Sequence, residues 1–205
     1  YETDLLTPSN LLYTEPTGNS NGKIEFLFTA EVNQELYYLE SPANWSPATM
    51  VKKTSLANFN PQTIYVAPFK LQDIEDFTVN TSTGGLFFGI GTNSNTSSQG
   101  VYKFENNTFS SLMTGSSVQS ICIGAGGNVY YANSGTIYDM QNNVVFTHPG
   151  SYSTFLSYDA SINTFFVVAQ DKIYDDQGNL LYQTPYQTGS MQDMTINTTT
   201  QKIMI

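Results

Sequence analysis

The sequence predicts an all-β fold, and three observations support that prediction. Short alternating or continuous apolar runs are bounded by Gly, Asn, Asp and Pro throughout the chain, as is typical of strands separated by turns. No apolar stripe with a period of 3.6 residues lasts for three helical turns. The same order of four short strands also recurs at roughly 35–40 residue spacing, which predicts a repeat architecture.

Three clear copies of this repeat occupy the middle of the chain. Their first strands read DFTVN, SICIG and TFLSY, and their third strands read GVYKFE, TIYDM and KIYDD. A looser copy, with longer loops, precedes them. The four copies are expected at about residues 24–68, 74–112, 118–148 and 152–185.

Each end of the chain carries half a repeat. Residues 191–205 contain the first two strands, DMTIN and KIMI. Residues 1–15 resemble the second half of the preceding repeat, because Asn-Leu-Leu-Tyr occurs at both 10–13 and 179–182. The two ends together are therefore expected to form a fifth repeat.

Five four-stranded antiparallel sheets, one of them closed by strands from both termini, form a five-bladed β-propeller without an exposed edge. The 205 residues give about 41 residues per blade, within the range of propeller repeats. Gly or Asp ahead of an Ile-Tyr or Val-Tyr third strand resembles the NHL and YVTN-type propeller repeats. The resemblance implies one propeller domain over residues 1–205 and carries no catalytic motif. An irregular β-sandwich with coincidental repeats is the alternative.

The composition excludes several classes of function. The chain has 7 Lys and Arg residues, all lysines, against 17 carboxylates, with a net charge of −10. Nucleic acids and anionic membranes bind clustered cations, so neither partner is expected. No apolar run is long enough for a membrane span. The single cysteine and single histidine exclude a disulfide framework and multi-histidine metal sites.

Ligands of propellers of this kind bind where loops converge at the mouth of the central channel. The two longest loops on that face are expected at 42–48 and 92–99, and they place Trp45, Asn93 and Gln99 among the candidate binding residues. An exposed indole can stack on the apolar face of a sugar. In the alternative interpretation, Trp45 folds back under its own loop.

Two carboxylates occupy matching positions at the start of inner strands. Asp76 and Asp193 are therefore candidate ligand-binding residues, and facing carboxylates can hydrolyse glycosides. The corresponding positions of two other repeats hold Ser120 and Thr154, so the acidic set is incomplete, and such a residue more often binds backbone amides. We expect no catalytic residue, no metal and no cofactor, although a calcium ion bound by these oxygens is chemically allowed.

The single histidine and the single cysteine are expected to be structural. His148 precedes Pro149 at the end of an outer strand, which predicts a surface position. Cys122 alternates with two isoleucines in an inner strand, which predicts a buried, inert thiol.

Five Asn-x-Ser/Thr sequons fall in predicted turns and loops, where a glycosylating enzyme can reach them. They begin at Asn44, Asn80, Asn95, Asn106 and Asn197. Together with the uncharged polar composition, they predict a secreted or surface-displayed chain.

The expected function is a non-enzymatic extracellular propeller that serves as a binding or structural module of a cell surface, virion or filament. Its partner would be a glycan or a protein, and the alternative is a glycosidase or lactonase-like enzyme that uses channel carboxylates. Residues 1–15 are expected to close their own blade. Strand exchange between copies is the alternative and would give self-assembly.

Overall fold

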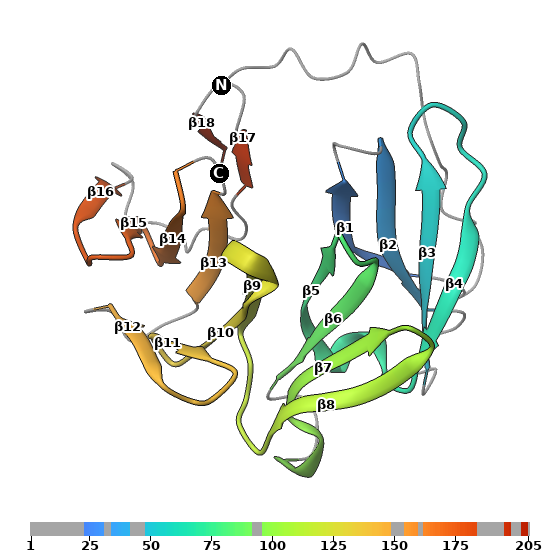
Figure 1. Cartoon of the computed structure of the whole chain (residues 1–205), viewed down its shortest axis with the longest axis horizontal. Coiled ribbons are helices and arrows are strands. Elements are labelled where there is room, and N and C mark those ends of the chain that lie inside the picture. The colour runs from blue at the N-terminus through green and yellow to red at the C-terminus, as the bar shows by residue number, and fades with distance from the viewer. Residues whose placement is uncertain are drawn as a thin grey trace. The chain divides into compact units, whose positions relative to one another are not determined.

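A computed structural model describes most of the chain (Figure 1). The chain divides into two compact units after Leu71, and each unit is described by itself. In the described part, no helix is long and apolar enough to cross a bilayer. The described residues are 23–30, 34–41, 48–91, 96–148, 154–159, 162–183, 195–197 and 202–204, with the backbone alone for 23–30, 96, 195–197 and 202–204.

The described part of the first unit contains a four-stranded antiparallel sheet in which strands follow one another in chain order. Leu39 and Val51 are paired across two of its strands, and both are fully buried. Lys53 forms an ion pair of 2.6 Å with Glu35 on the surface of the sheet. The strands are β1 (Lys23–Ala30), β2 (Glu35–Ser41), β3 (Thr49–Ser55) and β4 (Gln62–Ala67).

The second unit contains three four-stranded antiparallel sheets and one two-stranded sheet, again with strands in chain order. Short 3-10 turns η2 (Leu71–Asp73), η3 (Thr96–Ser98) and η4 (Ala125–Gly127) precede or join strands. The first sheet is formed by β5 (Ile74–Asn80), β6 (Gly85–Ile90), β7 (Gly100–Glu105) and β8 (Thr108–Thr114). The second comprises β9 (Ser120–Ile123), β10 (Val129–Asn133), β11 (Thr136–Asp139) and β12 (Val144–Thr147). The third comprises β13 (Thr154–Asp159), β14 (Thr164–Ala169), β15 (Lys172–Asp175) and β16 (Leu180–Gln183), and the last β17 (Thr195–Asn197) and β18 (Lys202–Met204).

The first strands of successive sheets in the second unit are neighbours. Strand β9 contacts both β5 and β13, and β13 contacts β17 (Figure 1). Because side chains alternate between the two faces of a strand, β9 contributes to two cores. Ile121 packs into the cluster with the β5–β8 sheet, and Cys122 packs into the cluster with the β13–β16 sheet. Each sheet is thus packed face to face with the next, as blades are in a propeller.

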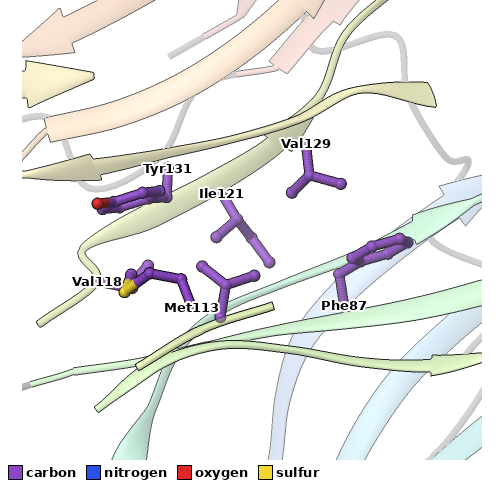
Figure 2. Close-up of a cluster of buried hydrophobic side chains, with 7 residues drawn as sticks. Phe87, Met113, Val118, Ile121, Val129 and Tyr131 are labelled. Atoms are coloured by element: carbon purple, nitrogen blue, oxygen red, sulfur yellow. The ribbon is translucent and has the colours of Figure 1, made fainter. Parts of the chain in front are cut away.

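The first of these clusters shows how closely the blades approach (Figure 2). A Cβ atom on Gly89 of β6 would lie 2.7 Å from Cγ1 of Val118 and 3.3 Å from Cγ2 of Ile121. Glycine therefore lets the backbone of one sheet contact the side chains of the next. The buried members of the cluster are Phe87, Val101, Met113, Val118, Ile121, Val129 and Tyr131.

Two hairpins of the second unit have two-residue turns with positive φ at both central residues. The values are 50° and 58° at Asn106 and Asn107, and 48° and 84° at Ser134 and Gly135. Type I′ turns require this conformation, which Asn and Gly adopt most readily, and their twist matches that of the flanking strands. Local sequence therefore determines where β7 joins β8 and where β10 joins β11.

The outermost strand of every four-stranded sheet carries a β-bulge at the same register. The extra residue is Ile64 in β4 and Leu112 in β8, and Val145 in β12 and Leu181 in β16. Each is followed by Tyr, Met or Phe. Bulges twist an edge strand away from pairing with another chain, so a common structural feature protects all four outer edges.

The predicted all-β class and the repeated four-stranded antiparallel sheets are confirmed. The four sheets are separate hydrogen-bonded units, each built from strands consecutive in sequence. Strands β17 and β18 pair with each other in an antiparallel arrangement. The number of blades, the single-domain organisation and closure by the termini stay predictions.

Candidate functional site

The carboxylate of Asp76 is bound by the scaffold at the start of β5. Its Oδ1 accepts a hydrogen bond of 2.7 Å from the amide of Phe77. Its Oδ2 accepts bonds of 2.6 Å from Oγ of Ser120 and 2.8 Å from the amide of Ile121. Both oxygens thus bind backbone amides, and one of them binds the inner strand of the next sheet, 44 residues along the chain.

Ser120 extends this link to a third sheet. Its Oγ donates to Asp76 and accepts a hydrogen bond of 3.0 Å from the amide of Leu156 on β13. Ser120 is 1% exposed, so water does not replace these bonds. A continuous chain of hydrogen bonds therefore connects β5, β9 and β13, and we call it the inner-strand tie.

Glu75 is the other acidic residue at this end of β5, and it lies at a β-bulge between Ile74 and Asp76. A Cβ on Gly91 would overlap with Cγ of Glu75, so the missing side chain of Gly91 makes room for the glutamate. Burial raises the pKa of the Glu75 carboxyl. A partly buried acid with a raised pKa can serve as a proton donor or acceptor.

The prediction that Cys122 is buried is confirmed. It is free and buried, next to the inner-strand tie. Burial, together with the charge of Asp76, raises the pKa of the thiol far above its usual range. Because the thiolate is the reactive form, we expect this cysteine to react slowly with oxidants and alkylating agents in the folded chain.

The prediction that His148 lies on the surface is wrong. The residue is 3% exposed, and its Nε2 lies 2.9 Å from Oγ1 of Thr154, which is equally buried. Its ring stacks on Tyr174, with centroids 6.2 Å apart, and its amide donates to the carbonyl of Gly135. His148 is buried because the chain returns here from the outer strand β12 to the inner strand β13, where the next sheet covers it.

The remaining predicted binding residues are only partly described. Gln99 is buried just before β7, and its carbonyl accepts a hydrogen bond from the amide of Gly115. Trp45, Asn93 and Asp193 lie outside the described residues. Their role in ligand binding stays a prediction, as does that of Gln99 and Asp76.

Three of the five sequon asparagines lie within the described residues. Asn106 lies in a described turn, and Asn80 and Asn197 end β5 and β17. Asn44 and Asn95 lie outside the described residues.

A carboxylate-centred turn that we did not predict as a motif occurs twice. Oδ1 of Asp139 accepts bonds from the amides of Gln141 and Asn143, and Oδ2 accepts one of 2.9 Å from Nδ2 of Asn143. Asp175 and Asn179 repeat this pattern before β16. The bonds from Asn143 hold the pKa of the Asp139 carboxyl below its usual value. The signal in the sequence is an Asp followed four residues later by Asn.

The described residues contain no cluster of side chains that could bind a metal ion. Among the described residues, no group of three or more His, Cys, Asp or Glu side chains is placed to hold an ion. The site is therefore characterised by hydrogen bonds between strands and by one partly buried acid, Glu75.

The inner-strand tie predicts a stability effect for Ser120→Ala. This change removes the donor to Asp76 and leaves the buried amide of Leu156 without its acceptor, so we expect a loss of about 1–3 kcal/mol in the free energy of unfolding. Chemical denaturation measures it. Ser111→Ala is the matched control, because Ser111 is exposed and should change stability by less than about 0.5 kcal/mol. Equal losses for both variants would contradict the tie.

The buried histidine predicts a dependence of stability on pH. Burial lowers the pKa of His148, so the unfolded chain binds the proton first as the pH falls. The contribution to stability is complete above the unfolded pKa of about 6.5 and decreases as the pH falls toward the lower folded pKa. Thermal unfolding from about pH 7.5 to 5 should show a steeper loss for the unmodified chain than for His148→Gln. Parallel curves would contradict this assignment.

Comparisons with known proteins support the fold. No family model matches the sequence, and no curated protein matches it. A gluconolactonase-like protein of known structure superposes with a TM-score of 0.56 and 12% identity, over 88% of this chain and 83% of its own. PorZ, a surface component of the type-IX secretion system of Porphyromonas gingivalis, matches with a TM-score of 0.54 and 12% identity, over 90% of this chain and 32% of PorZ. A protein of unknown function from Bacteroides thetaiotaomicron gives 0.52 and 12%, over 85% of this chain and 47% of its own.

This chain therefore spans most of the first of these structures and less than half of the other two. At such low identity the likeness concerns the fold alone. Together with the face-to-face packing of successive four-stranded sheets, it shows that the chain has a β-propeller fold.

Proposed function

We propose that this chain is a non-catalytic β-propeller that acts outside the cell as a binding or structural module. The observation that carries the proposal is the inner-strand tie. Asp76, the described member of the matching pair of carboxylates, binds its own strand through Oδ1 and the neighbouring strand β9 through Oδ2. A carboxylate bound by three scaffold donors supports the fold, and the same donors compete with any substrate for its lone pairs.

An external location is supported by the composition. Ser, Thr, Asn and Gln make up 76 of the 205 residues, and charged residues only 12%, so solubility depends on uncharged hydrogen bonding with water. The sequons add acceptor sites for glycans. One structural neighbour, PorZ, is itself a bacterial surface component.

The ligand in this proposal is a glycan or a protein bound by loop residues. Loops on a rigid scaffold carry most binding functions, and those at 42–48 and 92–99 provide Trp45, Asn93 and Gln99. Trp45 supplies the stacking surface, and the two amides supply directional hydrogen bonds.

Five blades with closure by both termini complete the proposed architecture. The outer-strand bulge supports it, because the four described examples share one sequence pattern. Leu180-Leu181-Tyr182 surrounds the bulge of β16, and Leu11-Leu12-Tyr13 repeats these residues near the N-terminus. Residues 1–15 would then supply the two outer strands of the sheet that β17 and β18 begin, and Leu12 would be the bulged residue.

One observation favours an enzymatic alternative. Glu75 is partly buried at a bulge, and its pKa is raised by burial, which is the condition of many general acids. A lactonase or glycosidase could use it, with Asp193 or Asp76 as the second carboxylate and calcium as an additional cation.

Binding and hydrolysis assays on the same purified chain test the function. We expect binding on a glycan or surface-protein array, weakened about tenfold by Trp45→Ala, since aromatic stacking contributes up to about 1.5 kcal/mol. We expect no turnover of lactones or aryl glycosides, with or without calcium. Glu75→Gln and Asp76→Asn are the matched variants for hydrolysis. Turnover that is lost in Glu75→Gln would replace this proposal with the enzymatic alternative.

Deletion of residues 1–16 tests closure. The shortened chain should remain folded and bind a peptide of residues 1–16, because strand addition at the edge of β18 restores the missing pairs. A peptide with Leu12→Asp is the control and should bind more weakly. The full chain should be monomeric on sizing chromatography. Multimers that disappear on deletion would show exchange between copies, and failure to bind the peptide would contradict closure itself.

A further inference from the structure

Of the five sequons, two have described side chains, and their surroundings differ. The sequon Asn106-Asn107-Thr108 forms the type I′ turn between β7 and β8, and all three residues are exposed. Among the described residues, neither the side-chain amide of Asn106 nor that of Asn107 has a hydrogen-bond partner. The Oγ1 of Thr108 donates to the backbone carbonyl of Asn106, at 3.4 Å. The positive φ of Asn106 is fixed by the hairpin, so its side chain is presented at the tip of the turn.

At the second sequon, in contrast, the side chain of Asn80 is hydrogen-bonded and lies close to the next sheet. Oδ1 of Asn80 accepts hydrogen bonds from the amides of Ser82 and Thr83, at 3.0 and 3.3 Å. These bonds fix which end of the amide is nitrogen. They direct Nδ2 toward the β9–β10 turn of the next sheet, where a Cβ on Gly127 would lie 3.2 Å from it. A sugar on this nitrogen would have to occupy space beside the backbone of that turn.

We propose that Asn106 is the acceptor of an N-linked glycan and that the folded chain excludes one from Asn80. The inference rests on the proposed external function, because transfer requires a donor found along the secretory route. That donor is a lipid-linked oligosaccharide. Nδ2 of Asn106 forms a bond to C1 of the first sugar, the bond from C1 to the lipid phosphate oxygen breaks, the lipid phosphate leaves, and the amide loses one proton.

A glycan at Asn106 would lie beside the edge of a sheet. The turn leads directly into β8, the outer strand of its sheet, and β8 contains no charged residue. A sheet edge without charged side chains lacks the usual protection against pairing with other chains. A hydrated glycan at the start of β8 adds steric protection to that of the bulge at Leu112, without adding charge.

The experiment maps glycan occupancy at each sequon in the full chain after passage through a glycosylating secretory pathway. Glycopeptide mass spectrometry reads each site separately. Thr108→Ala destroys the first sequon and Thr108→Ser preserves it, and both leave Asn106 in its turn. Ser82→Ala and Ser82→Thr are the corresponding pair for Asn80, and both keep the backbone amide that binds Asn80.

We expect a glycan at Asn106 in the unmodified chain and in Thr108→Ser, and none there in Thr108→Ala. Asn80 should be unoccupied, so that Ser82→Ala changes no glycopeptide. Occupancy of Asn80 equal to that of Asn106, or an empty Asn106 with other sequons filled, would overturn this inference alone. A chain that is secreted with every sequon empty would contradict both the inference and the expectation of a glycosylated external protein.

Discussion

Burial of both faces of each sheet is the constraint on which the second unit depends. Strand β9 shows it most clearly, because Ile121 and Cys122 are adjacent in sequence and belong to two different cores. A sheet of this kind leaves an apolar face in water if either neighbour is removed. Apolar packing alone allows sheets to slide, whereas the inner-strand tie from Asp76 through Ser120 to Leu156 is directional and fixes their relative height. Stability is therefore expected to be shared between neighbouring sheets, as in other repeat folds.

Local patterns in the sequence predicted the strands. The contacts between sheets could not be predicted from such patterns. Alternation with period two and turns such as Asn106-Asn107 depend on a few adjacent residues, so they can be identified without a structure. The type of role played by Asp76 was also predictable, but its partner Ser120 is 44 residues away. The error at His148 has the same origin. Its place at the end of an outer strand suggested exposure, and only the return of the chain to β13 brings Thr154 and Tyr174 over its ring.

The arrangement separates the groups that hold the scaffold from those free to bind a ligand. Polar groups inside the second unit, including Ser120, Thr154 and His148, are hydrogen-bonded between strands. In the described part, no buried side-chain nitrogen or oxygen lacks a partner. Such satisfied networks rigidify a fold, and any loss of a partner is costly. Because the interior polar groups are bound in this way, the proposed ligand specificity would come from the loops, whose sequences differ between repeats while the strands are similar.

The outer strands raise a different physical problem. None of β4, β8, β12 and β16 contains a charged residue, although charged side chains, lysine in particular, are the usual protection of sheet edges. The chain has only 7 lysines, and it protects all four edges by a bulge at one register instead. The bulge needs no charge, so it remains effective when carboxylates are protonated or when salt screens electrostatic repulsion. Leu180 and Leu181 of β16 are nevertheless about half exposed, and a bulge leaves that apolar surface in water. In the proposed function, a bound partner would cover this apolar surface of β16, which connects the uncharged edges of this propeller to its proposed place on an external surface.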